Sequence, residues 1–207
     1  MIKKIIYISV ILIVFTFSSC KNDTNSADNK TVKDSVEVII DLETSEQISE
    51  LCLSINANIS KNLYQMQEFN TLCQNTEIEA YLTKYLNSEN EIIKIEIALN
   101  NTKMFEIVEY YFYQNKLIEK YDYIEIYENK NATAEEYIVY FKNELIFNKT
   151  IQQGSGINIE KAYQQFESME PEIIKSKEDE SKIINEESIL LAKVSSNEEL
   201  NSYYCKK

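Results

Sequence analysis

The residue types that most catalytic sites require are missing from this chain of 207 residues. It contains no histidine and no arginine, and all 21 of its basic residues are lysine. The absence of imidazole excludes Ser-His and Cys-His nucleophile pairs and His-ligated metal sites. Gly154 and Gly156 are the only glycines, which excludes glycine loops that bind phosphates or dinucleotides. Chemistry by carboxylates alone, as in glycosidases and some calcium sites, remains open.

The acidic residues do not have the spacing of a calcium-binding loop. The densest acidic run, Glu178-Asp179-Glu180, flanks a predicted helix and is typical of a solvated surface. We therefore expect a protein that is not an enzyme, with no catalytic residues, no metal site and no cofactor. The net charge of −13 makes nucleic acid an unfavourable partner, because phosphates would be repelled.

One cysteine, Cys20, stands in a pattern that predicts a covalent modification. Met1-Ile2-Lys3-Lys4 is a basic start, residues 5–17 are an apolar run apart from Tyr7, Ser9 and Thr16, and Ser18-Ser19 supply small residues before Cys20. Thirteen helical residues span only about 20 Å, short of the ~30 Å bilayer core, so a permanent membrane span is disfavoured. The segment resembles the signal peptide of bacterial lipoproteins, although Phe17 stands where leucine is usual.

This resemblance implies that residues 1–19 are removed and that Cys20 carries the acyl chains, palmitate among them. The lipid would then anchor the chain to a bacterial membrane in the cell envelope, the outer membrane in particular, with the folded part facing the periplasm or the cell surface. Residues 20–39 are polar and predicted to form a flexible tether, and residues 40–207 a single domain. Removal of Lys3 and Lys4 leaves 19 lysines against 34 acids, so we expect the lipid, not the domain, to contact the membrane.

Three further cysteines, Cys52, Cys73 and Cys205, allow at most one intramolecular disulfide. Cys52 lies on the apolar stripe of a predicted helix and is expected to be a small core residue. Cys205 could pair with either of the other two or remain free. No histidine is present to activate a thiol, so a catalytic cysteine is not expected.

Tyrosine is the residue type that could form a recognition surface, since the chain contains 15. Between residues 117 and 127, alternation predicts that Leu117, Glu119, Tyr121, Tyr123, Glu125 and Tyr127 face one way, and that Ile118, Lys120, Asp122, Ile124 and Ile126 face the other. Flat amphipathic rings suit recognition of a ligand or a protein partner. In the competing interpretation, strands are rich in tyrosine anyway and these rings pack beneath helices. The candidate binding residues are Tyr111, Tyr113, Tyr121, Tyr123 and Tyr127.

The elements that must position these side chains begin with a helix predicted over residues 44–66. Thr44-Ser45-Glu46-Gln47 has the spacing of a capping box. Apolar residues then recur at steps of three and four and form one buried stripe. These residues are Ile48, Leu51, Cys52, Ile55, Ile59, Leu63 and Met66.

From residue 76 to residue 152 the apolar period changes to two, which predicts about six strands. The clearest alternation lies in residues 91–99 and places Ile93, Ile95, Ile97 and Leu99 on one face. The breaks are short and rich in asparagine, which favours an antiparallel meander whose turns use Asn in place of Gly. The predicted strands are 77–86, 91–100, 104–113, 117–128, 135–142 and 145–152.

Two of the hairpins share a pattern of Tyr-Phe, an Asn turn and Leu-Ile. It occurs as Tyr111-Phe112 before Leu117-Ile118 and as Tyr140-Phe141 before Leu145-Ile146. This pattern resembles lipoproteins of the Bacteroidota with an α+β domain and flanking helices, and the resemblance implies no particular activity.

After Gly154-Ser155-Gly156, residues 159–169 and 183–194 have helical spacing, with Pro171 interrupting the first helix or restarting it. The fold class is therefore predicted to be α+β, with one N-terminal helix and the C-terminal helices packed on one face of the meander. We expect an envelope lipoprotein with a non-enzymatic binding or scaffold role. The alternative is an acidic immunity or inhibitor lipoprotein that neutralises a toxin or hydrolase.

Overall fold

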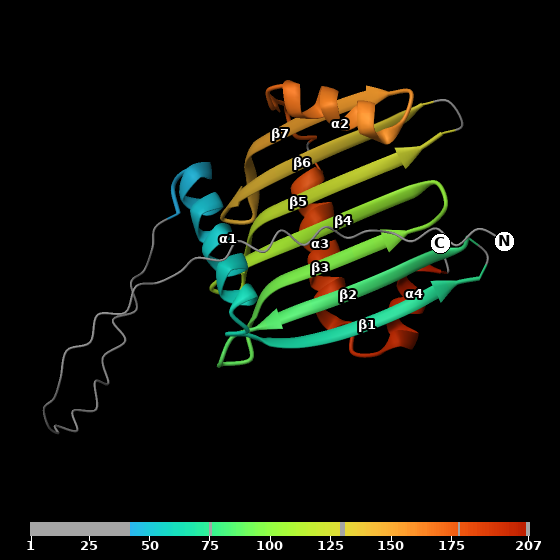
Figure 1. Ribbon diagram of the computed structural model, residues 1–207. Coiled ribbons are helices and arrows are strands. Elements are labelled where there is room, and N and C mark those ends of the chain that lie inside the picture. The colour runs from blue at the N-terminus through green and yellow to red at the C-terminus, as the bar shows by residue number, and fades with distance from the viewer. Residues whose placement is uncertain (1–41, 75, 129–130, 178, 206–207) are drawn as a thin grey trace, which may run out of the picture. The chain divides into compact units, whose positions relative to one another are not determined.

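An antiparallel sheet forms the centre of the fold (Figure 1). The computed structural model describes residues 42–205 except 75, 129–130 and 178, so the predicted signal peptide, Cys20 and the predicted tether lie outside the described residues. The α+β class and the meander are confirmed, whereas the expected six strands are eight in the described chain. They pair in chain order: β1 (Gln65–Cys73), β2 (Ile78–Leu86), β3 (Ile92–Asn100), β4 (Met104–Tyr113), β5 (Lys116–Tyr127), β6 (Ala132–Lys142), β7 (Leu145–Gly156) and β8 (Glu172–Ile173).

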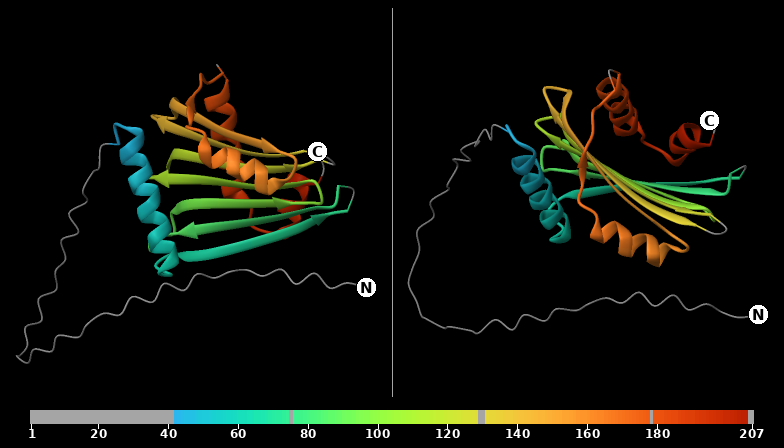
Figure 2. Two further views of the ribbon diagram at one scale, coloured as in Figure 1. Left: turned by 45° about the horizontal axis from the view of Figure 1, so that its top comes forward. Right: turned by 90° about the horizontal axis from the view of Figure 1, so that it is seen from above.

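Helices cover parts of both faces of this sheet. They are α1 (Ser45–Ser60), α2 (Ile159–Ser168), α3 (Glu180–Lys193) and α4 (Asn197–Tyr204). Figure 2 shows the sheet from its edge, with α1 and α2 on one side and α3 and α4 on the other. We call these sides the α1 face and the α3 face. The expectation that all helices pack on one face is wrong, because the strands carry large buried side chains on both sides.

Four elements differ from the sequence prediction. The first helix begins with the predicted capping box between Thr44 and Gln47, which is confirmed, but it ends at Ser60 and not at residue 66. Asn62 adopts a left-handed φ of 56°, which ends the helix and redirects the chain into β1. Most residues of β1 are exposed and its sequence has no apolar alternation, so the pattern does not predict a strand there. The short β8 follows Pro171, and α4 is a separate helix after α3.

Bulges in three hairpins explain how α1 finds an apolar surface. In each hairpin one residue of the second strand has no partner: Ile93 in β3, Ile118 in β5 and Phe147 in β7. An extra residue reverses the alternation beyond it. Ile93 and Ile118 therefore pack with α1 in one cluster, and the Phe147 ring lies 6.3 Å from the Tyr140 ring.

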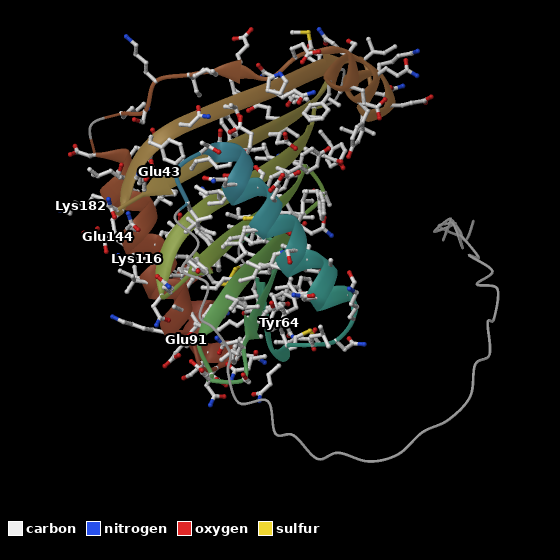
Figure 3. All side chains as sticks on the ribbon, turned by 90° about the vertical axis from the view of Figure 1, so that its left-hand side faces the viewer. Glu43, Tyr64, Glu91, Lys116, Glu144 and Lys182 are labelled. Carbon is white, nitrogen blue, oxygen red and sulfur yellow. A yellow bond between two sulfur atoms is a disulfide. The ribbon has the colours of Figure 1, made fainter. Side chains whose placement is uncertain are left out.

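These bulges correct two sequence expectations. Ile93 does not share a face with Ile95, which belongs to the cluster on the α3 face. Leu117 likewise lies on the α3 face, whereas Ile118 contacts the α1 cluster, the reverse of the prediction. The bulged hairpins meet at the end of the sheet that α1 crosses, and Figure 3 shows this end with Glu91, Lys116 and Glu144 labelled beside the turns.

Asparagine takes the place of glycine in the hairpin turns, as expected. Gln114-Asn115 and Asn143-Glu144 are two-residue turns in which all four residues have positive φ, between 50° and 66°. Positive φ at both positions is the geometry of a type I′ turn, whose twist matches that of the strands.

The two glycines permit close packing of α2 on β7. A Cβ atom at Gly154 would lie 2.2 Å from the carbonyl oxygen of Ala162 and 2.4 Å from the amide nitrogen of Phe166. Gly156 would meet the backbone of the same helix at 2.7 Å. Close approach, not a turn, therefore explains why glycine stands at these positions.

A disulfide joins Cys73, at the end of β1, to Cys205, directly after α4, and it encloses a sequence separation of 132 residues. Cys52 is free and buried, so the expectation of a small core residue there is confirmed. Within the described part of the chain, no helix combines the length and the apolar character needed to cross a bilayer.

Candidate functional site

A groove of about 520 Å³ lies on the α1 face, between α1 and the central strands. We call it the tyrosine groove. Helix α1 crosses the ends of the central strands (Figure 1), and the groove is lined by α1 on one side and by the sheet beneath. The wall from α1 consists of Ser49, Cys52, Leu53 and Asn56, and the floor consists of Ile107, Glu109 and Tyr111 from β4, Glu119, Tyr121 and Tyr123 from β5, and Ile138 and Tyr140 from β6.

Helical spacing brings the α1 residues to the groove. Ser49, Cys52 and Asn56 follow one another at steps of three and four and therefore lie on one side of the helix. Ser49 Oγ and Tyr140 Oη are 2.9 Å apart, and Asn56 Nδ2 donates to Tyr111 Oη at 2.8 Å. Tyrosine hydroxyls thus fix the helix against the sheet.

At one end of the groove, a buried ammonium group is already surrounded by carboxylates and rings. Lys94 Nζ lies 2.6 Å from Glu109 Oε1 and 3.1 Å from Glu96 Oε2. It also donates to Asn56 Oδ1 at 3.1 Å and lies 5.1 Å from the centre of the Tyr111 ring. The Tyr111 hydroxyl donates to Glu109 in turn. This arrangement combines ion pairs with a cation–π contact.

Glu119, in the middle of the floor, is 7% exposed and has no such cation. Within the described chain, no lysine lies at ion-pair distance from it. Its hydrogen-bond donor is the thiol of Cys52, which is a weak donor. Burial, with the charges of Glu109 and Glu136, raises the pKa of Glu119 to about 7. The carboxyl group is therefore poised to gain or lose a proton near neutral pH.

Glu125 has a different environment at the far end of β5. Its carboxylate accepts hydrogen bonds from Tyr123 at 2.9 Å, from Tyr163 at 2.8 Å and from Tyr127. The Tyr123 ring also lies 6.3 Å from Phe166 of α2. Three hydroxyl donors satisfy this carboxylate, so this end of the face is a packed contact between β5 and α2.

The five tyrosines predicted from the sequence separate into two groups. Tyr111, Tyr121 and Tyr123 line the groove, although Tyr111 and Tyr123 are buried and only Tyr121 is half-buried. Tyr113 packs beside the α1 cluster near the turn, and Tyr127 lies with Glu125, so neither contributes to the groove lining. The tyrosines therefore share a face, but that face is half-covered and not an open patch.

Sequence reasoning missed the residues that give the groove its chemistry. In the sequence, Lys94 and Glu109 alternate with apolar residues, as solvent-facing residues of a strand do. Their ion pair depends on the register between β3 and β4, in which Lys94 lies opposite Tyr111. Asn56 could not be distinguished by sequence from the other polar residues of α1. One sequence pattern could have indicated this ion-pair cluster: Lys94 and Glu96 carry opposite charges two residues apart in β3 and therefore share a face.

Within the described residues, no group of three or more Cys, Asp or Glu side chains could hold a metal ion.

No family model, no curated protein and no solved structure matches this chain.

Proposed function

We propose that this chain is a lipid-anchored protein of the bacterial cell envelope whose folded unit binds a ligand through the tyrosine groove without catalysing a reaction. The observation that carries the binding role is the groove itself, in which α1 and three strands hold the rings of Tyr111, Tyr121 and Tyr140 around a concave surface. Rings that are already fixed by packing and hydrogen bonds lose little conformational freedom when a ligand binds.

The non-enzymatic role is supported by how the polar groups of the groove are used. Glu109 is engaged by Lys94 and Tyr111, and Tyr140 by Ser49. Burial raises the pKa of the Cys52 thiol, with the charge of Glu119 adding to the effect, so the thiol is a poor nucleophile. These side chains hold the fold together and leave no activated nucleophile beside a base.

The envelope location is supported by the pattern before Cys20 and by the disulfide between Cys73 and Cys205. Structural disulfides persist in exported proteins and are rare in the reducing cytosol. The anchor would hold the acidic domain near a membrane that its charge alone would not attract.

Lipid anchoring is tested by replacing Cys20 with Ala and supplying a labelled palmitate to cells that express the protein. Label should be incorporated into the wild-type chain and be absent from the Cys20→Ala chain, which should also leave the membrane fraction. Equal labelling of both chains would refute the anchor.

The binding role is tested by capture of partners and small molecules from envelope extracts with the full chain. Tyr121→Ala should weaken capture, whereas Tyr81→Ala, at an exposed tyrosine outside the groove lining, should not. Capture that is equal in both variants would argue against the groove. A basic toxin or hydrolase in the captured fraction would favour the inhibitor role.

A further inference from the structure

We propose that the tyrosine groove binds a small organic cation, whose ammonium group lies beside the carboxylate of Glu119 and the rings of Tyr121 and Tyr140. This inference rests on the binding role proposed above and adds the chemical class of the ligand. It follows from the position of Glu119, the composition of the groove and the contacts that the ammonium group of Lys94 makes on the same face.

The position of Glu119 surrounds its carboxylate with aromatic residues. It pairs with Tyr111 across β4 and with Tyr140 across β6, and Tyr121 lies two residues further along the same face of β5. Directly paired residues have Cβ atoms about 5 Å apart, so the two rings flank the carboxylate. The side chain is buried, lines the groove and forms no ion pair with a lysine of the described chain, although the charge of Lys94 acts on it from a distance.

The charge balance of the groove favours a cation over an anion or a neutral ligand. Lys94 is the buried lysine beside the groove among the described residues, and Glu96 and Glu109 already share it. Glu136 is engaged by the hydroxyl of Tyr121, at the side of the groove away from Lys94. Once Glu119 is ionised, above about pH 7, it and Glu136 add negative charge that no lysine of the described chain neutralises through an ion pair. An ammonium ligand would supply the missing charge.

The surroundings of Lys94 show that this face accommodates an ammonium group. Its Nζ lies over the Tyr111 ring at 5.1 Å from the ring centre and over the Tyr85 ring at 5.9 Å, with carboxylates beside it. Of the tyrosine rings near Glu119, the Tyr111 ring already has Lys94 over it, whereas no lysine of the described chain lies over the rings of Tyr121 or Tyr140. Tyrosine rings bind ammonium groups through the negative potential of their faces.

The size of the groove indicates a small molecule. Its volume of about 520 Å³ lies within the range of small-molecule sites, which extends over roughly 300–1,000 Å³. Leu53 and Ile138 provide apolar contact for methyl or methylene groups next to the ammonium group. A compact alkylammonium or quaternary ammonium ligand fits this composition.

The test compares choline with 3,3-dimethylbutan-1-ol, which has the same shape but no charge. Binding is measured by calorimetry on the purified full chain in a maltoside detergent, which carries no ammonium group. Choline should bind saturably, and the alcohol should bind about tenfold more weakly or not at all, because it lacks the attraction of both the carboxylate and the rings. Equal affinity for the two compounds, or no saturable binding of choline, overturns the proposal.

Glu119→Gln assigns the effect to this carboxylate, because the amide preserves shape and removes the charge. We expect about a tenfold loss of choline affinity, and a similar loss in Tyr121→Leu, which removes the ring face at a half-buried position. Glu106→Gln is the matched control, since Glu106 lies outside the groove lining and should leave affinity unchanged. Unchanged affinity in both groove variants overturns the proposal, and thermal unfolding of each variant checks that it is folded. Failure here with intact palmitate labelling and Tyr121-dependent capture would reject the cation and keep the proposed function.

Discussion

The two faces of the sheet are built from the same strands, yet they treat polar groups in opposite ways. On the α3 face, Leu82, Ile95, Val139 and Leu191 belong to one apolar cluster that α3 and α4 close (Figure 2). On the α1 face, a groove remains between α1 and the central strands, and the apolar cluster is smaller. The difference shows that one face of a meander can hold most of the apolar core while the other face leaves tyrosines and carboxylates accessible to a ligand.

Buried polar groups on the α3 face mostly complete the helices. Lys84 Nζ donates to the carbonyl oxygen of Ala192 at 2.6 Å and to that of Val194, which satisfies the end of α3. The Tyr110 hydroxyl donates to Glu187 of α3 at 2.7 Å. On the α1 face, by contrast, the buried Glu119 has only a thiol donor within the described chain. The buried Lys84 and Tyr110 are therefore satisfied by helix α3, whereas the Glu119 carboxyl lies at a groove that could hold a ligand.

The largest expected effect on this comparison comes from the disulfide, which holds α4 beside β1 on the α3 face. Cys205→Ser should lower the free energy of unfolding by about 4 kcal/mol, because the covalent loop between Cys73 and Cys205 restricts the unfolded chain. Cys52→Ala, at the free cysteine of the α1 face, should cost about 1 kcal/mol. Chemical denaturation measures both. Equal losses would mean that the two faces contribute alike.

A second test uses the same substitution on each face. Leu191 of α3 is fully buried, so Leu191→Ala should cost about 3 kcal/mol through lost apolar contact and the cavity left behind. Leu53 of α1 is 68% exposed at the groove, and Leu53→Ala should change stability by no more than about 0.5 kcal/mol. If the two variants unfolded at the same denaturant concentration, the distinction between a closed and an open face would fail.

A third test uses pH at Glu119. Its pKa is about 7 in the folded chain, above the usual 4.5, so the unfolded chain loses its proton first as pH rises. Stability is therefore full below about pH 4.5 and falls through about pH 7, by an amount on the order of 2–3 kcal/mol for a buried group. The titratable neighbours that face Glu119 are Cys52 from α1, Lys94 from β3, Glu109 and Tyr111 from β4, Tyr121 from β5, and Glu136 and Tyr140 from β6.

Glu119→Gln should remove this decline, so that the variant matches the wild type at pH 4 and is more stable at pH 8. Glu106 provides the comparison, because burial and the charge of Asp122 raise its pKa to about 7 as well, outside the groove. Choline should reduce the loss of stability with rising pH that Glu119 causes, and should leave unchanged the loss that Glu106 causes. Thermal unfolding across pH measures both, and an unchanged profile in Glu119→Gln would contradict the assignment.

The sequence predicted the regular parts of the fold and missed what breaks regularity. Alternation located six strands because their residues face apolar clusters, whereas β1 lacks that pattern since most of its residues are exposed. The bulges at Ile93, Ile118 and Phe147 could not be read from alternation, because an apolar pair after a turn looks the same with and without a bulge. Those bulges decide which residues reach α1. The common face of Tyr121 and Tyr123 was predictable, but its cover by α1 and α2 depends on distant parts of the chain.

The smallest effect concerns a turn that belongs to neither face. Glu144 occupies the second position of the β6–β7 turn with a φ of 66°, and its side chain is exposed. A residue with a Cβ atom pays a steric cost in the left-handed region, which glycine avoids. Glu144→Gly creates the favoured Asn-Gly turn and should raise the free energy of unfolding by about 0.5–1 kcal/mol. Glu144→Ala is the control, because it removes the same charge without relieving φ and should give no gain.

The Glu144→Gly variant also sharpens the comparison between the faces. The β6–β7 turn joins strands that contribute Phe141 to the α3 face and Tyr140 to the α1 face, so a tighter turn stabilises both together. Choline affinity should therefore stay unchanged while the denaturation midpoint rises. A change in affinity would show that the groove depends on the register of β7, where the bulged Phe147 lies against Tyr140. In that case the recognition side of the sheet would extend to the hairpin end, and the boundary between the stable and the open parts would lie along the strands as well as across them.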